Sequence, residues 1–347
     1  IVGQARRSAG ICETMAPAWS ERLAAITGLE LDPYFVAPKV AWLRERVGPG
    51  PVITTTDTWL LHRLTGAFAT DVSTASRTLL LDLDRGVWSD EAASAFGIDP
   101  STLPDIAANA TTSLGETGVF GGSVPVTGVC VDQQAALFAE ACHGAGEAKC
   151  TYGTGAFLLA STGARPTRST NGLVGCVAWQ VDGETTWCLD GQVYTVGSAV
   201  SWLQDVGVIV EPSDLDRLGG SVDDAGGAWF VPGLAGLAAP FWRPNAKGSF
   251  TGLSLATTRS HLVRALIDGI AASVACLVRA TSADLGAPLT RLRVDGGVTR
   301  SRTLLQAQAD IAQVPIEVYP SPHATALGVA AFARLGAAGG DRLALTD

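Results

Sequence analysis

Three short stretches of the sequence combine residue types that could bind a phosphate and activate a hydroxyl group. The first is Gly153-Thr154-Gly155, between two apolar runs that are typical of strands. Glycines let backbone N–H groups approach a ligand closely, and successive N–H groups in such a turn form a concave anion site. The Thr154 hydroxyl adds a donor. A plain hairpin turn is the alternative, and it is favoured when the motif is taken alone.

The second stretch is Asp295-Gly296-Gly297, which follows a strand pattern and precedes a helix pattern. A turn of this kind brings backbone N–H groups and the positive end of a helix to one place, where an anion can bind. An ordinary strand-to-helix turn explains the same residues, and in isolation it is again the favoured interpretation.

The third stretch is Asp132-Gln133, at the end of the β-branched run 124–131. A buried carboxylate costs free energy unless it is paired or used. Such a carboxylate can take the proton of a substrate hydroxyl as a general base, and the Gln133 amide can hydrogen-bond a neighbouring hydroxyl. Asp132 could instead cap the helix that follows it.

The elements around these motifs predict an α/β protein, because strand and helix patterns alternate along the chain. Helices are expected over most of 1–50, and a short strand and then a helix over 52–66. Near residues 139–146 a helix pattern gives way to glycine-rich strands, so we expect one domain over 1–140 and another over 141–347. The remaining expected elements are a strand over 124–131 leading into a helix, strands within 149–162 and 173–190, helices at 197–204, 261–283, 301–311 and 324–333, and strands at 292–294 and 315–318.

Bulk composition excludes several classes of protein. The chain has 347 residues, 47% of them apolar, which is enough for about two globular domains. Its net charge of −9 argues against a protein that binds nucleic acid through the phosphate backbone. Without a run of 18 apolar residues, no membrane span is expected. The sequence also lacks GxxxxGK[ST], so bound ATP would be held mainly by glycine turns rather than by a P-loop.

The cysteines and histidines argue for a reduced protein without a histidine-based metal site. Seven cysteines occur without any CxxC spacing, which fits free thiols in the cytoplasm. The four histidines lie far apart in the sequence, so no metal-binding cluster is visible.

Taken together, the motifs resemble the FGGY carbohydrate kinases, and within them the glycerol kinase type. The resemblance extends over essentially the whole chain, and the order of the matching segments makes chance similarity very improbable. The strongest segments are DPYFVAPKVAWL (32–43), DTWLLHRLTG (57–66), TDVSTASRTLL (70–80), GVCVDQQAALFAE (128–140), TYGTGAFLLASTG (151–163), VPGLAGLAAPFW (231–242), GSFTGLSLATTRSHLVRALIDGI (248–270), LRVDGGVTRSRTLLQAQADI (292–311) and ATALGVAAF (324–332).

The resemblance implies two actin-like (ribonuclease H-like) domains, with ATP and a polyol meeting in the cleft between them. It implies that Asp132 is the catalytic base and lies near the Mg²⁺ shell, contacting the ion through water. ATP and Mg²⁺ are thus the implied cofactors. Implied polyol contacts are Tyr34, Asp132, Gln133 and Phe157, and implied nucleotide contacts are Gly153, Thr154, Gly155, Gly197, Ser201, Gly296, Gly297 and Ser301.

Departures from the family pattern bear on which substrate is bound and on whether the first domain is complete. Gly3 stands where a tryptophan usually packs on the polyol, which implies a larger pocket. Ser201 and Ser301 stand where glutamine and asparagine are common. The family's first phosphate-binding strand pair and its Arg-Glu polyol clamp are not found, so we expect an incomplete first domain.

The sequence therefore predicts a cytoplasmic kinase that transfers the γ-phosphoryl group of ATP to a small polyol, with glycerol as the first candidate. One alternative is a kinase for another polyol or for a ketopentose such as xylulose or ribulose. Another is an inactive fragment that still binds nucleotide. Whether the protein forms a homo-oligomer is left open.

Overall fold

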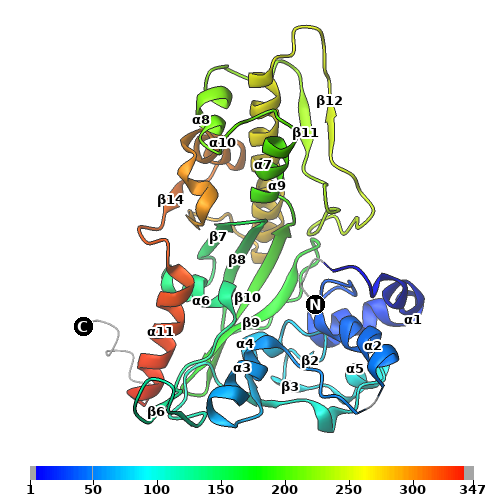
Figure 1. The fold of residues 1–347 in the computed structure, drawn as a ribbon, viewed down its shortest axis with the longest axis vertical. Coiled ribbons are helices and arrows are strands. Elements are labelled where there is room, and N and C mark those ends of the chain that lie inside the picture. Colours follow the sequence, from blue (N-terminus) through cyan, green and yellow to red (C-terminus); the bar gives the residue numbers. More distant parts are fainter. Residues whose placement is uncertain (1–4, 49, 340–347) are drawn as a thin grey trace.

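A six-stranded mixed sheet forms the centre of the molecule (Figure 1). The computed structural model describes residues 5–48 and 50–339, so Gly3 lies outside the described residues. The middle strand β7 runs parallel to β13, which runs parallel to β14, whereas β7, β8, β10 and β9 are successively antiparallel. In spatial order the strands are β14 (Ile316–Val318), β13 (Leu292–Asp295), β7 (Ala148–Tyr152), β8 (Ala156–Gly163), β10 (Glu184–Val193) and β9 (Val174–Val181).

One face of this sheet packs against the long helix α9 (Arg259–Leu285) in an apolar core. Leu158 and Val294 of the strands and Leu266 of the helix are all fully buried there. A Cβ atom on Gly191 would stand 2.9 Å from Leu277, so a glycine in β10 lets the helix lie close to the sheet. The same core includes residues of α7 (Gly197–Asp205), α8 (Asp214–Gly219), α10 (Arg302–Ala312) and the β11 (Trp229–Val231) and β12 (Ser249–Thr251) hairpin.

The other face of the sheet packs against the first part of the chain. Leu159, Val174 and Cys176 of the strands share a buried cluster with Leu23 and Phe35. The elements of this part are α1 (Ala9–Thr27), α2 (Val36–Val47), α3 (Thr56–Thr65), β1 (Ala69–Asp71), α4 (Val72–Ala75), β2 (Leu81–Asp82), β3 (Val87–Trp88), α5 (Asp90–Ala95), η1 (Pro100–Thr102), β4 (Asp105–Ala107), β5 (Glu116–Thr117) and β6 (Val124–Pro125).

The last helix, α11 (Ala324–Ala337), returns to lie along α6 (Asp132–Ala139), as Figure 1 shows. Gly328 makes this possible, because a Cβ atom there would stand 1.9 Å from the carbonyl oxygen of Ala135. Phe138 and Phe332 meet with ring centroids 4.4 Å apart. The two helices therefore pack as one unit.

Most predicted elements are present, but two predicted strands are wrong. Residues 52–55 form no strand, and the run 124–131 is a strand only at β6. Further along that run the backbone does not pair with a strand. Val129 exchanges hydrogen bonds with Asn109, which lies in a bend, and the Val131 N–H donates to the hydroxyl of Ser73 in α4. β-Branched residues favour strands only where a partner strand is available.

Two other expectations can be compared with the structure. All seven cysteines are free thiols. Helix α9 is long and apolar enough to cross a membrane by length and composition, and it is the one such helix among the described residues. However, 56% of its most apolar window is buried inside the fold, as in the core helix of a globular protein.

Candidate active site

The two predicted glycine turns lie side by side at one edge of the sheet. Because β7 and β13 are parallel neighbours, their carboxyl ends meet at the same edge. Gly296 has φ +100°, and a Cβ atom there would stand 2.4 Å from the carbonyl oxygen of Tyr152, the last residue of β7. Only glycine fits this close approach with this backbone conformation. The turns 153–155 and 296–297 are thus neighbours.

The N-terminus of α7 closes against the first of these turns. The Gly197 N–H donates to the Gly153 carbonyl (3.0 Å), and the Ser198 N–H donates to the Thr154 carbonyl (3.1 Å). A Cβ atom on Gly197 would stand 2.5 Å from that Gly153 oxygen. The positive end of the helix dipole therefore adjoins the exposed Thr154, which favours a bound anion.

Asp132 lies in the first turn of α6, and the residue at the N-cap is Val131. The alternative in which Asp132 itself caps the helix is therefore wrong. Its carboxylate accepts the Gln133 backbone N–H at 2.8 Å, and the residue is otherwise exposed. A negative charge in the first helical turn is stabilised by the helix dipole.

Contacts connect Asp132 to the same edge of the sheet. The Lys149 ammonium, in β7, donates to the side-chain oxygen of Gln133 and to the Thr151 hydroxyl (2.8 Å). Thr151 is paired with Asp295 across β7 and β13, and it stands two residues before the Gly153 turn. Gln133, the neighbour of Asp132, is therefore bonded to β7, the strand that ends at the first glycine turn and lies beside the second.

Two further predicted polyol contacts, Tyr34 and, on the carbon side of the substrate, Phe157, have neighbours in this region. Phe157 is paired with Thr151 on one side and Gln192 on the other. The Tyr34 ring stacks on Tyr194 at 5.9 Å. Burial raises the pKa of Tyr34, and the Asp132 carboxylate adds to this rise, so the phenol lies within the electrostatic range of Asp132.

The loop that carries Tyr34 is held by a buried lysine. The Lys39 ammonium donates to the carbonyls of Pro33, Tyr34 and Phe35, and the Tyr34 N–H donates to the Asp32 carboxylate at 2.8 Å. Burial lowers the pKa of Lys39 to about 8. These bonds fix the loop backbone.

Sequence reasoning missed a set of buried polar residues on the sheet face toward the first part of the chain. Arg77 forms an ion pair with Asp190 of β10, and Gln192 donates to the same carboxylate at 3.1 Å. Lys149 lies in register with Leu159, which in turn is opposite Asp190. The available signal was polar residues at alternate positions of otherwise apolar strands, in AKCTY and LDGQV.

The two serines predicted to contact nucleotide differ in their surroundings. Ser201 is exposed on α7. The Ser301 hydroxyl is buried, donates to the Asp216 carboxylate at 2.9 Å and accepts the Leu304 N–H at 3.2 Å, so it caps α10. Both contacts with nucleotide stay predictions, and the internal bonds of Ser301 disfavour one through its hydroxyl.

A magnesium ion would have to rely on the nucleotide for most of its ligands. Among the described residues there is no group of three or more His, Cys, Asp or Glu side chains that could hold a metal ion. Mg²⁺ is commonly bound through one or two carboxylates, several waters and substrate phosphates. The exposed Asp132 carboxylate fits that mode of binding.

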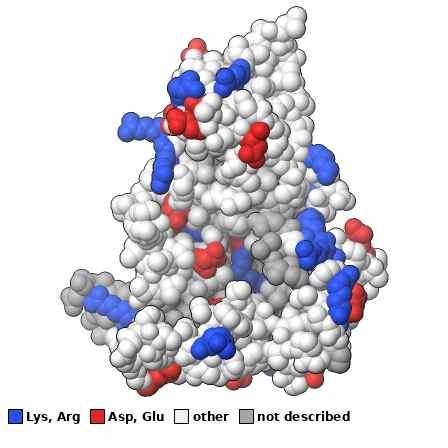
Figure 2. Space-filling view, in the orientation of Figure 1, with Lys and Arg blue, Asp and Glu red and all other residues white. Residues whose placement is uncertain are grey.

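A hollow between the upper and lower parts of the molecule contains both acidic and basic side chains (Figure 2). The two signs of charge are mixed over this face of the molecule.

The fold and the paired glycine turns are those of a carbohydrate kinase. Residues 1–139 match the FGGY family of carbohydrate kinases, N-terminal domain, and residues 148–337 match the C-terminal domain of that family. The chain belongs to the FGGY family of carbohydrate kinases. The predicted family and fold class are thereby confirmed, whereas the predicted domain limits stay a prediction.

Curated relatives include a glycerol kinase from Thermus brockianus, 44% identical over 96% of this chain and 70% of its own length. A glycerol kinase from Myxococcus xanthus is 43% identical over 97% of this chain and 71% of its length. Among solved structures, Plasmodium falciparum glycerol kinase with ADP has a TM-score of 0.87 and 34% identity, covering 95% of this chain and 69% of that one. Xylulose kinase from Rhodospirillum rubrum has a TM-score of 0.81 and 26% identity, covering 97% of this chain and 70% of that one.

Proposed function

We propose that this protein transfers the γ-phosphoryl group of ATP to a hydroxyl of a small polyol, with glycerol as the first candidate. The observation that supports the proposal is that Gln133, next to Asp132, is bonded to β7, whose carboxyl end carries one glycine turn and lies beside the other. Identity of 44% to a glycerol kinase over nearly the whole chain supports the choice of substrate. Free thiols are consistent with action in the cytoplasm.

In this proposal the turns hold the nucleotide and α6 supplies the base. The 153–155 turn binds the β- and γ-phosphates through backbone N–H groups and the Thr154 hydroxyl, and the positive end of the α7 dipole favours their charge. The 296–297 turn contacts the rest of the nucleotide. Gly197 keeps the helix end against the turn. A bound Mg²⁺ would neutralise charge on the phosphates. Positioning and charge stabilisation supply most of the catalysis in phosphoryl transfer.

The chemical step follows from the place of Asp132. Its carboxylate takes the proton of the substrate hydroxyl as that oxygen bonds to the γ-phosphorus. The bond from the γ-phosphorus to the bridging oxygen breaks, and ADP leaves with the bond's electron pair. The Gln133 amide and the Tyr34 hydroxyl hydrogen-bond the polyol, and the Phe157 ring packs against its carbon atoms.

An assay of ADP release tests this proposal. The protein is mixed with ATP and Mg²⁺ and given glycerol, erythritol, xylulose or ribulose in separate reactions. Release of ADP that depends on glycerol, and is fastest with it, is expected. Release that is fastest with a ketopentose would move the substrate toward the alternative that the xylulose kinase likeness supports. An absence of polyol-dependent release with all four would contradict the kinase proposal.

Nucleotide binding without turnover is the second candidate. Departures from the family pattern motivate it, since Ser301 stands where asparagine is common and Gly3 stands where tryptophan is usual. Titration calorimetry with ADP and with ATP separates the two candidates, because binding without any polyol-dependent ADP release would support the second.

A further inference from the structure

Lys149 has a buried ammonium group whose hydrogen-bond partners are neutral oxygens. The residue is fully buried in β7, and its Nζ donates to the side-chain oxygen of Gln133 and to Thr151 Oγ1. Moving an ammonium group out of water carries a large penalty unless nearby charges and hydrogen bonds offset it. A buried lysine next to the proposed base therefore needs an explanation.

Two buried acidic residues lie near Lys149 without a hydrogen bond to it. Glu140, at the end of α6, is 1% exposed, and neither of its carboxylate oxygens has a hydrogen-bond partner among the described residues. Burial raises the pKa of Glu140 to about 8, so this group is mainly neutral at pH 7. Asp295 is also buried, with Oδ1 lacking a partner in the same part of the structure. Asp295 is paired in register with Thr151, the residue whose hydroxyl accepts a hydrogen bond from Lys149.

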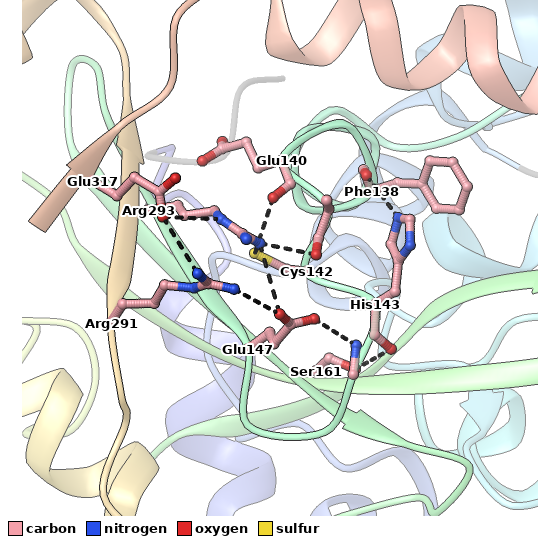
Figure 3. Close-up of polar contacts among 11 residues, drawn as sticks. Phe138, Glu140, Cys142, His143, Glu147, Ser161, Arg291, Arg293 and Glu317 are labelled. Carbon is pink, nitrogen blue, oxygen red and sulfur yellow. Dashed lines mark hydrogen bonds and ion pairs between the residues drawn. The ribbon is translucent and has the colours of Figure 1, made fainter. Parts of the chain in front are cut away.

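The neighbouring arginines are bound elsewhere. Arg293, paired with Lys149 across the sheet, contacts Glu147, Glu317 and the Ala141 carbonyl. Figure 3 shows this network below the end of α6, with the Glu140 carboxylate turned away from it. The arginines therefore leave Lys149 as the cation that contacts Gln133.

The chemistry of lysine decides the orientation of the Gln133 amide. An ammonium group has donors only, so the amide must present its oxygen to Lys149. Its NH₂ group then faces the other way, where Nε2 lies 3.4 Å from the Asp132 Oδ2 atom. A flipped amide would point its oxygen at the carboxylate and its N–H groups at the ammonium, and like partial charges would repel at both ends.

We propose that Lys149 is a positioning residue that holds the Gln133 amide with its N–H groups toward Asp132 and the hydroxyl-bearing substrate. One N–H then supports the carboxylate, and the other is free to donate to a substrate oxygen. The catalytic part of this inference rests on the proposed function, because it takes Asp132 as the base. The orientation of the amide does not depend on it.

Lys149→Met tests the proposal, with the same change at the exposed Lys247 as the matched control. We expect kcat to fall at least about tenfold in Lys149→Met, since misplaced catalytic contacts are costly, with the KM for ATP unchanged. Lys247→Met keeps the activity of the parent. A double variant with Gln133→Leu should be no slower than Gln133→Leu alone, because both changes remove the same contact. Fully additive losses would overturn the proposal.

A spectroscopic readout separates this proposal from the proposed function. In ¹⁵N-labelled protein, the side-chain NH₂ signals of Gln133 should shift on Asp132→Asn, and this response should be lost in Lys149→Met. An unchanged response in Lys149→Met overturns the positioning role even if the enzyme is active. If the parent protein phosphorylates no polyol, the proposed function fails while the NH₂ signals still decide the orientation.

Gln133→Glu keeps the test decisive if Lys149→Met does not fold. The new carboxylate still accepts from Lys149 but offers Asp132 no N–H, so activity should fall as far as in Gln133→Leu while the fold is kept. Activity of Gln133→Glu near that of the parent would overturn the proposal.

Discussion

The two faces of the central sheet are both buried, but they are built from different residues. Toward α9 the strands present Cys150, Leu158 and Val294, all within an apolar core. Toward the first part of the chain the same strands present Lys149 and Asp190 beside the apolar Leu159. Because side chains alternate along a strand, one set of strands serves both faces.

The two faces therefore contribute differently: the apolar face mainly to the stability of the fold, and the polar face to the orientation of side chains. The apolar face gains free energy from burial alone, roughly in proportion to area. The polar face bears the cost of buried charges, which is offset only when their hydrogen bonds are made with good geometry. Hydrogen bonds of this kind hold side chains in one orientation, and this face leads to the carboxyl end of β7, where the candidate site lies.

The largest expected effect comes from Asp132→Asn, at the edge of the polar face. Losing a general base commonly costs about 10²–10⁴-fold in rate, while ADP affinity and thermal stability should stay near those of the parent because the change is close to isosteric. Steady-state kinetics and calorimetry with ADP check this. Loss of ADP binding instead would reassign Asp132 to the nucleotide or metal site.

Arg77→Met tests whether the polar face depends on its ion pair. The change leaves the Asp190 carboxylate buried and unpaired, which commonly costs about 3–5 kcal/mol. Urea unfolding measures the loss of stability. Adding Asp190→Leu should recover part of that loss, because it removes the unpaired charge. A double variant less stable than Arg77→Met would contradict this explanation.

Leu266→Ala, on α9, tests whether the apolar face contributes to stability without positioning the site. Removing a fully buried leucine side chain should lower the free energy of unfolding by about 2–5 kcal/mol. At a temperature where the variant is folded, the KM values for polyol and ATP should be those of the parent. A large rise in either KM would show that the apolar face also positions the site.

The smallest expected effect is a pH-dependent gain in stability from Glu140→Gln. Burial raises the pKa of Glu140 to about 8 from an ordinary 4.5, so the folded protein holds a proton that the unfolded chain releases between these values. This contribution to stability is full below pH 4.5 and is lost as the pH rises through 8. The melting temperature of Glu140→Gln should therefore exceed that of the parent by a few degrees at pH 8 and by less at pH 5. A gap that narrows toward pH 8 would contradict the assignment.

The sequence predicted the elements and residues whose signals are local. The periodicity of α9, the glycine turns after β7 and β13, and the helix beginning at Asp132 are each contained in one short segment. The strand expected over 124–131 is wrong because much of its backbone bonds to Asn109 and Ser73 rather than to a partner strand. Both residues are distant in sequence, so the local pattern does not reveal them.

Residues whose role depends on a distant partner were not predictable from local patterns. Arg77 and Asp190 are far apart in the chain and become a pair only through the packing of the first part against β10. Lys149 could be noted as a polar residue in an apolar strand, but its contact with Gln133 depends on how α6 lies over β7. Ser301 was predicted from its position in a motif, and its bond to Asp216 of α8 was not foreseeable there.

The packing of α11 against α6 determines which part of the molecule carries the proposed base. Gly328 and Phe332 of the final helix hold α6, whose Gln133 is tied through Lys149 to β7. In a motion of the two parts of the fold, Asp132 should therefore move with β7 and the glycine turn that follows it. In such a motion the boundary between the two moving parts would lie before α6, although residues 1–139 match the N-terminal family domain.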